Sequence, residues 1–110
     1  MSKRPPRVIT IAEIERYFPL ADASYWFGDR WCPAVHERKD GGYAIRVRTM
    51  QRHSGSSSTL NFDYFELDAD GVITTAPRGF ARDFKPGQVT DIKTQVERFA
   101  TPDPNARRIA

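Results

Sequence analysis

Few side chains in this sequence could act as a nucleophile, a general base or a metal ligand. The chain has one cysteine, Cys32, and two histidines, His36 and His53. On a strand, Cys32 and His36 would face the same way but stand about 13 Å apart, which is too far for a thiolate pair. One cysteine and two histidines also lack the spacing of structural zinc motifs. We therefore predict no catalytic residue, no metal and no cofactor, and we expect a protein that is not an enzyme.

One acidic motif resembles the opening of a calcium-binding loop, with Asp68 and Asp70 followed by Gly71. Such a loop needs a glycine at its sixth position and a bidentate glutamate at its twelfth. Ile73 and Gly79 occupy these two positions here. The motif therefore predicts a hairpin turn rather than a metal site.

A group of arginines is the remaining set of side chains that could bind a ligand. Alternation along residues 43–52 places three arginines on one face of a predicted strand, opposite the face of Tyr43. Arginines beside aromatic rings on a sheet can hold single-stranded nucleic acid, with arginine on phosphate and a ring on a base. The basic N-terminal residues would then be a mobile arm that becomes ordered on contact. The residues of this hypothesis are Arg46, Arg48, Arg52, Lys3, Arg4 and Arg7.

The distribution of charge favours a different role for the strand arginines. The net charge is +3 and the isoelectric point is about 9.3, but three basic residues before residue 8 already equal this surplus. Residues 8–101 contain 12 basic and 13 acidic side chains. We therefore favour the interpretation that Asp63 and Glu66, or Glu37, neutralise these arginines in cross-strand pairs worth about 0.2 to 1 kcal/mol each.

Aromatic residues are dense in the connector of residues 19–30 and directly after it. They are Tyr25, Trp26, Phe27 and Trp31. Aromatic side chains commonly bury about 150 to 250 Å² each and dominate protein cores, so these rings could close one end of a sheet. The alternative is an exposed surface that binds a partner.

Three functions remain open. The one we favour is a small non-enzymatic accessory or adaptor domain that binds another protein, or a second copy of itself. It would use the aromatic connector or an open sheet edge marked by Pro33. The first alternative is a nucleic-acid-binding domain that uses the arginines above. The second is a small-molecule-binding domain with a cleft under the aromatic connector, where His36 or Asp29 would be the acid or base.

Two β-hairpins are expected to position these side chains. In the first, residues 31–38 and 43–50 flank Asp40-Gly41; in the second, residues 60–67 and 72–75 flank Asp70-Gly71. Asp-Gly between two β-prone runs is a strong local signal for a hairpin.

The predicted register depends on the loop length. A first loop closed by Lys39 and Gly42 would place His36 opposite Ile45 and turn Cys32 and His36 toward the core. In the third strand the apolar alternation changes near Tyr64. This change predicts either a strand covered on both faces or a bulge.

Two helices complete the expected fold. Thr10, followed by Glu13, is a helix-capping pattern, and Pro19 should end that helix; a short strand over residues 8–11 is the alternative. Residues 89–100 carry an apolar stripe at helical spacing. The predicted class is α+β, with a short N-terminal helix, a four-stranded antiparallel sheet of two consecutive hairpins, and a C-terminal amphipathic helix packed on one face.

A length of 110 residues predicts one folded unit. We expect a disordered basic arm at residues 1–7, a single α+β domain at 8–101 and a polar tail at 102–110. The sequence has no apolar run of about 18 residues, so we expect no membrane association. A lone cysteine cannot form an internal disulfide and is typical of a cytoplasmic protein.

Overall fold

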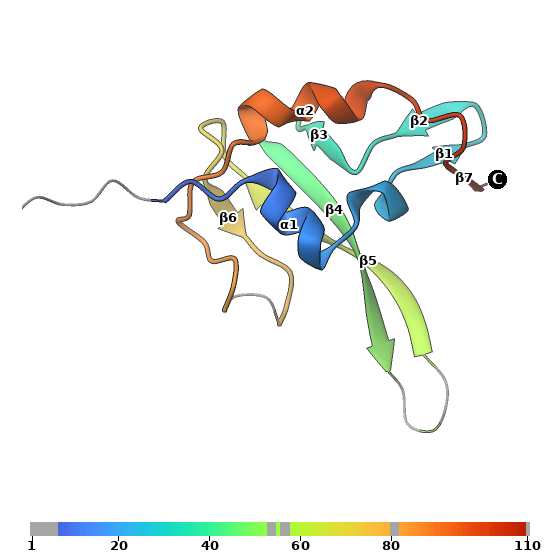
Figure 1. The fold of residues 1–110 in the computed structure, drawn as a ribbon, viewed down its shortest axis with the longest axis horizontal. Coiled ribbons are helices and arrows are strands. Elements are labelled where there is room, and N and C mark those ends of the chain that lie inside the picture. The colour runs from blue at the N-terminus through green and yellow to red at the C-terminus, as the bar shows by residue number, and fades with distance from the viewer. Residues whose placement is uncertain (1–6, 53–54, 56–57, 80–81, 110) are drawn as a thin grey trace, which may run out of the picture.

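The computed structural model describes residues 7–52, 55, 58–79 and 82–109. Its helices are α1 (Ile11–Tyr17), the 3-10 helix η1 (Leu20–Ala23) and α2 (Ile92–Ala100). Its strands are β1 (Tyr25–Phe27), β2 (Arg30–Cys32), β3 (Val35–Glu37), β4 (Tyr43–Arg52), β5 (Ser58–Leu67), β6 (Ile73–Thr75) and β7 (Arg107–Ile109). They form a four-stranded antiparallel sheet, β3-β4-β5-β6, and a three-stranded sheet, β2-β1-β7 (Figure 1). The predicted α+β fold with two consecutive hairpins in a four-stranded sheet is confirmed.

The first predicted turn reverses the chain at Asp40-Gly41. The backbone N–H of Gly41 donates to the carbonyl of Arg38 at 3.1 Å, and the N–H of Arg38 donates to the carbonyl of Gly42 at 2.8 Å. Gly41 has a φ of 89°, a left-handed conformation that glycine adopts at little cost. This is a three-residue hairpin loop in which the glycine forms a bulge.

The predicted register of β3 against β4 is wrong by one residue, because the loop is one residue longer than expected. Val35 lies opposite Ile45, and His36 lies opposite Ala44. A shift of one residue moves a strand side chain to the other face of the sheet. Val35 is therefore buried in the core, whereas the half-buried His36 lies on the opposite face.

The second predicted turn has the same design. The N–H of Asp68 donates to the carbonyl of Val72 at 2.9 Å, and Gly71 has a φ of 84°. Oδ1 of Asp68 accepts from the N–H groups of Asp70 and Val72 at 2.9 and 3.0 Å. The acidic motif is thus a hairpin turn, as predicted. Within the described ranges, no group of three or more His, Cys, Asp or Glu side chains could hold a metal ion.

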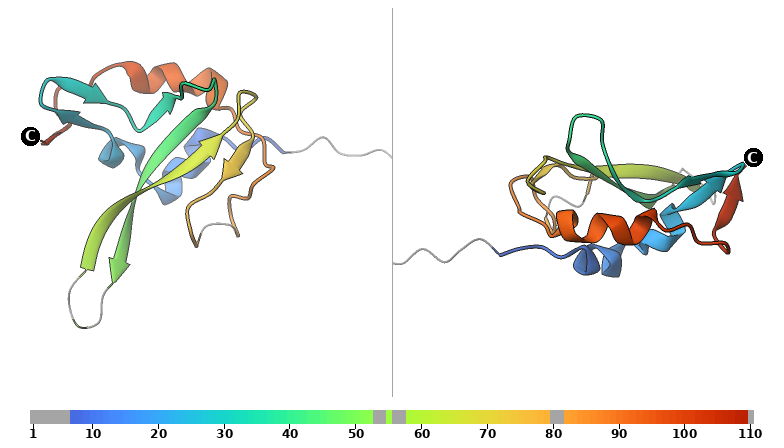
Figure 2. Two further views of the ribbon diagram at one scale, coloured as in Figure 1. Left: turned by 180° about the vertical axis from the view of Figure 1, so that it is seen from behind. Right: turned by 90° about the horizontal axis from the view of Figure 1, so that it is seen from above.

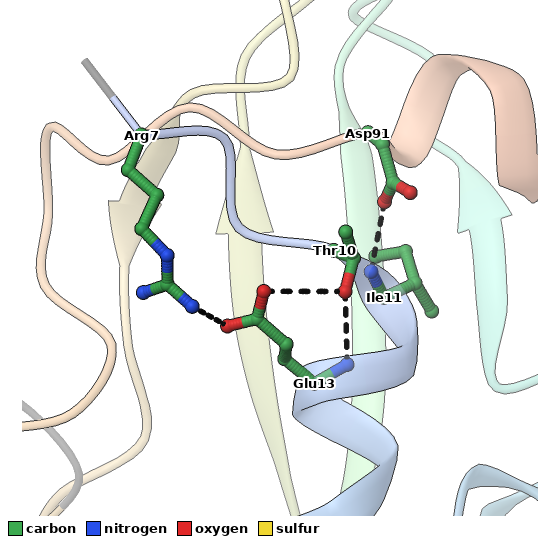
Figure 3. A network of polar contacts seen from close by, with 5 residues as sticks. All are labelled: Arg7, Thr10, Ile11, Glu13 and Asp91. Atoms are coloured by element: carbon green, nitrogen blue, oxygen red, sulfur yellow. Dashed lines mark hydrogen bonds and ion pairs between the residues drawn. The ribbon is translucent and has the colours of Figure 1, made fainter.

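The predicted start of the N-terminal helix is confirmed, and the alternative of a strand is wrong. Oγ1 of Thr10 accepts from the N–H of Glu13 at 3.1 Å, and Arg7 pairs with the carboxylate of Glu13 (Figure 3). The N–H of Ile11 donates to Oδ1 of Asp91 at 2.8 Å. These contacts satisfy N–H groups that have no partner inside the helix. They also tie the start of α1 to the start of α2.

The C-terminal helix begins at Ile92 rather than at the predicted Val89. The carbonyl of Val89 accepts from the N–H of Ile9 at 2.8 Å, and the N–H of Thr90 donates to the carbonyl of Gly71 at 2.9 Å. These tertiary hydrogen bonds hold the two residues in extended backbone. In the part of the chain that the structure describes, no helix is long and apolar enough to cross a membrane.

The core lies between the helices and one face of the four-stranded sheet. Figure 2 shows α1 and α2 on the same side of β4 and β5. The largest buried side chains from the two layers include Ile11, Ile14, Leu20, Ile92, Ile45, Val47, Phe65 and Leu67. Val96 and Phe99 of α2 pack against them, so the predicted packing of the amphipathic helix on one face is confirmed.

The alternation of β5 is regular along its whole pairing with β4, so no bulge occurs at Tyr64. Phe65 and Leu67 face the core, and Phe62 and Tyr64 lie on the other face, each 40% exposed. The irregularity is in the pairing of β5 with β6, between Glu66 and Leu67.

The predicted connector contains a hairpin of its own. Gly28, with a φ of 60°, and Asp29 form the two-residue turn between β1 and β2, and glycine suits the first position of such a turn. The predicted strand of residues 31–38 is therefore divided at Pro33. Residues 107–109, within the expected polar tail, form β7, which pairs in parallel with β1.

Candidate functional site

The face of the four-stranded sheet away from the helices is the candidate site, and we call it the open face. Register places the following residues on it: His36 of β3, Ala44, Arg46 and Arg48 of β4, and Phe62, Tyr64 and Glu66 of β5. Among these residues Glu66 has the one carboxylate. That carboxylate lies 3.4 Å from the guanidinium of Arg38 in an ion pair.

Arg46 is interior, with 6% of its surface exposed. Its guanidinium donates to the carbonyls of Ala23 at 2.9 Å, Cys32 at 2.9 Å and Pro33 at 3.2 Å. It also lies 4.5 Å from the ring centroid of Tyr25. The expectation that carboxylates neutralise this arginine is wrong. Backbone carbonyls and an aromatic ring hold it, and it ties β4 to the chain that precedes β3.

Arg48 has a different environment from Arg46. It is half-buried, and its guanidinium lies 6.0 Å from the ring centroid of Phe62. The backbone of Arg52 pairs with Ser58 at the end of β4, but its side chain is outside the described part of the structure. Of the two β4 arginines whose side chains the structure describes on the open face, Arg46 is structural and Arg48 is partly exposed.

The N-terminal residues of the nucleic-acid hypothesis do not extend the open face in the described structure. Lys3 and Arg4 lie outside the described residues. Arg7 pairs with Glu13 at the start of α1, on the helix side of the sheet.

The four aromatic residues of the connector are divided between two faces of the small sheet. Trp26 lies opposite Trp31, with ring centroids 5.3 Å apart. The indole N–H of Trp26 donates to the carbonyl of Asp103 at 2.8 Å, and that of Trp31 donates to the carbonyl of Phe99 at 3.0 Å. Both tryptophans are half-buried and hold the C-terminal segment against β1 and β2.

Tyr25 and Phe27 occupy the other face of the small sheet. The ring of Tyr25 stacks on Phe62 with centroids 5.7 Å apart, so this face meets the open face at the stacked pair. Phe27 is 51% exposed. Directly paired residues on neighbouring strands share a face, so Arg30, opposite Phe27, and Arg107, opposite Tyr25, lie on it too.

Arg30 and Arg107 were not recognised in the sequence. The Gly28-Asp29 turn between two aromatic runs could have revealed the hairpin that carries Arg30. No local signal could have placed Arg107, because its position depends on pairing with β1, about eighty residues earlier in the chain.

These residues form one continuous set, which we call the arginine–aromatic surface: Tyr25, Phe27, Arg30, Arg48, Phe62, Tyr64 and Arg107. Among the residues that the structure describes, the arginines in ion pairs are Arg7, Arg38 and Arg98. No carboxylate of the described residues therefore neutralises the three arginines of the surface. They carry positive charge beside exposed rings.

The imidazole of His36 is half-buried and lies near two arginines. Burial lowers the pKa of its imidazole, and the positive charges of Arg46 and Arg38 lower it further, against a hydrogen bond with the backbone of Pro33. The ring is therefore neutral at neutral pH. It lines a depression of about 280 Å³ on the open face, whereas Asp29 is exposed in the β1–β2 turn.

Comparisons with known proteins assign neither a family nor a function to this surface. No family model, no curated protein and no solved structure matches the chain.

Proposed function

We propose that this protein binds single-stranded nucleic acid on the arginine–aromatic surface and catalyses no reaction. The observation that carries the proposal is the environment of Phe62. Its ring is 40% exposed, Tyr25 stacks on it, and Arg48 lies beside it without a carboxylate partner among the described residues.

Each part of this arrangement suits one part of a nucleotide. An exposed aromatic ring stacks on a base of any type, a contact worth about 1 to 3 kcal/mol per base. A free guanidinium binds phosphate with paired, charge-assisted hydrogen bonds. Rings and cations that alternate over a surface therefore suit a single strand, whose bases are free to turn outward.

The shape and charge of the β4–β5 hairpin also support the proposal. β3 pairs with β4 at Tyr43–Ile45, and beyond this point β4 and β5 continue as a two-stranded ribbon that projects from the body (Figure 1). From Arg46 to Phe62 the sequence contains three arginines and no aspartate or glutamate. Asp63, opposite Val47, belongs to the same ribbon but faces away from the open face. A ribbon whose sequence is mainly basic favours a phosphate backbone as the partner.

The adaptor function favoured from the sequence stays a prediction. The reason for the adaptor function is that the sequence has more aromatic side chains than a small core needs. Trp26 and Trp31 have contacts within the chain, to Asp103 and Phe99, so two of those four aromatics no longer need a partner to explain them. This supports nucleic acid over a protein-binding aromatic surface.

Fluorescence anisotropy with a labelled single strand of about 16 nucleotides tests the proposal, because such a length covers sites of the usual size. We expect affinity to fall as salt rises. The slope of log K against log salt should decrease by about 0.7 in Arg48→Ala. Phe62→Ala should weaken binding by about 5- to 100-fold.

Arg16→Ala and Tyr17→Ala are matched controls, because they remove an exposed arginine and an exposed aromatic from α1, on the other side of the sheet. Both should bind like the unmodified protein. Absence of binding at low salt, or binding that does not change with salt, would exclude the proposed function.

A further inference from the structure

A depression on the open face lies beside the arginine–aromatic surface. It has a volume of about 280 Å³ and is lined by His36, Arg38, Ala44, Tyr64 and Glu66. Register explains its presence, because Ala44 lies between His36 on β3 and Glu66 on β5. The short side chain of Ala44 leaves a gap between longer neighbours.

The size of the depression suits a single ring system. Pockets for drug-sized ligands usually measure about 300 to 1,000 Å³, so this one matches a smaller planar group. Tyr64, 40% exposed, offers a ring for stacking. Phe62 is two residues from Tyr64 along β5, about 7 Å away, so one strand could reach both rings.

The charged residues of the depression present both an acceptor and a donor. Arg38 and the hydroxyl of Thr75 both contact Oε2 of Glu66, at 3.4 and 3.5 Å. A ligand would therefore meet Oε1, since a carboxylate accepts several hydrogen bonds. Arg38 is paired with both Glu66 and Asp40, at 3.4 and 3.3 Å, so its charge is already neutralised and the depression favours the base of a nucleotide over its phosphate.

The carboxylate of Glu66 beside the guanidinium of Arg38 matches one of the four bases better than the others. Guanine has two neighbouring N–H donors, N1–H and the N2 amino group, beside the acceptor O6. A carboxylate can accept from both donors while a nearby guanidinium donates to the oxygen. Adenine, cytosine and uracil or thymine do not offer two adjacent donors next to an acceptor in this order.

Building on the proposed function, we propose that this depression is the subsite for one base of the bound strand and that it prefers guanine. Tyr64 stacks on the base, Oε1 of Glu66 accepts from both N1–H and N2–H, and Arg38 donates to O6 with an N–H that it does not use for Glu66 or Asp40. The other bases of the strand bind without selection on Phe62 and Tyr25.

Titration of the isotopically labelled protein with GMP, AMP, CMP and UMP, followed by NMR, tests the subsite without a strand. We expect GMP to shift the amide signals of His36, Tyr64 and Glu66 at about 5- to 100-fold lower concentration than the other nucleotides do. Inorganic phosphate should not shift them. An equal response to all four nucleotides, or the same response to phosphate, would overturn the subsite.

Glu66→Gln keeps the size of the side chain and removes its charge, so it should abolish the preference for GMP. Asp63→Asn is the matched control, because Asp63 lies on β5 opposite Val47 and faces away from the open face. It should keep the preference. Ala44→Val should fill the depression and abolish the response to GMP. If Ala44→Val fails to fold, the loss of preference in Glu66→Gln still tests the subsite.

A second experiment separates this inference from the proposed function. Anisotropy compares an all-thymine strand with the same strand carrying one guanine. Binding that depends on Arg48 and Phe62 but ignores the guanine would overturn the subsite and leave the proposed function in place. A GMP response without binding of any strand would keep guanine recognition in the depression but remove the proposed function, and with it the role of the depression in holding a strand.

Discussion

The ring of Tyr25 lies on the ring of Phe62, with centroids 5.7 Å apart and ring planes at 23°. Tyr25 belongs to β1 and Phe62 to β5, so the pair joins the two sheets. Stacked aromatic pairs contribute about 0.5 to 1.5 kcal/mol beyond the area that they bury. The same pair is partly exposed, so one contact both supports the fold and forms the centre of the proposed binding surface.

Arg46 should be important for stability. In Arg46→Ala, the carbonyls of Ala23, Cys32 and Pro33 lose their donor and Tyr25 loses its cation. We expect the free energy of unfolding to fall by about 3 kcal/mol, measured by urea denaturation. Arg48→Ala is the control and should change it by less than about 0.5 kcal/mol. Equal stability of the two variants would contradict the structural role of Arg46.

Arg107 and Arg108 are neighbours on β7 that face opposite ways. Arg107 shares a face with Tyr25, whereas the guanidinium of Arg108 lies 5.1 Å from the ring centroid of Trp26. Arg107→Ala should reduce the salt slope of strand binding by about 0.7, and Arg108→Ala should leave it unchanged. Hydrogen exchange of β7 controls for loss of the strand. Equal slopes for the two variants would place the bound strand away from β7.

Two glycines with left-handed backbone should differ in their tolerance of a side chain. At Gly41 a Cβ would meet nothing within 4 Å, whereas at Gly71 it would lie 3.0 Å from the carbonyl oxygen of Thr90. Gly41→Ala should cost about 1 kcal/mol through backbone strain alone. Gly71→Ala should cost about 2 to 3 kcal/mol, because Thr90 must also move. Thermal or urea unfolding measures both, and equal costs would show that the Gly71 turn does not pack against Thr90.

His36 should make stability depend on pH. Its folded-state pKa lies below the ordinary value of 6.5, so the unfolded chain takes up the proton first as pH falls. The contribution of His36 to the free energy of unfolding should be at its maximum above about pH 6.5. It should decrease below this pH until His36 of the folded protein is protonated too. Arg46 and Arg38 lie near the ring and oppose the added charge, and Glu66 lines the same depression.

Urea denaturation across this pH range checks the prediction. His36→Gln should remove this part of the pH dependence. A decrease of the same size in the His36→Gln variant would assign the effect to the carboxylates instead.

Trp26 should hold the C-terminal segment through its indole N–H. Trp26→Phe keeps a ring but loses the 2.8 Å hydrogen bond to Asp103, worth about 1 kcal/mol. We expect trypsin to cleave faster after Arg107 and Arg108, while the urea midpoint changes little. Phe27→Leu, at the exposed end of β1, is the control. Unchanged cleavage in Trp26→Phe would show that β7 is held by its backbone pairing alone.

Local signals in the sequence determined the turns and the first helix. Asp40-Gly41 and Asp70-Gly71 reverse the chain because their glycines accept a left-handed backbone. Thr10 begins α1 because its hydroxyl reaches an N–H group three residues away. These choices depend on neighbours within a few residues, so the sequence alone is enough to predict them.

The tertiary structure decided where α2 begins. Hydrogen bonds to Ile9 and Gly71 delay its start until Ile92. These contacts join segments that are far apart in the sequence, so local preference cannot predict them. The register of β3 is a local matter, because hydrogen bonds within residues 38–42 form the bulge at Gly41 that turns His36 away from the core.

The same division holds for the candidate site. Alternation along β4 determined that Arg46 and Arg48 share a face, because strand side chains repeat every two residues. Which of them is available for a ligand was decided by carbonyls that come from residues 23, 32 and 33. Arg107 reaches this surface because β7 pairs with β1. The charge of the face is therefore a property of chain packing, and the total charge of the sequence did not reveal it.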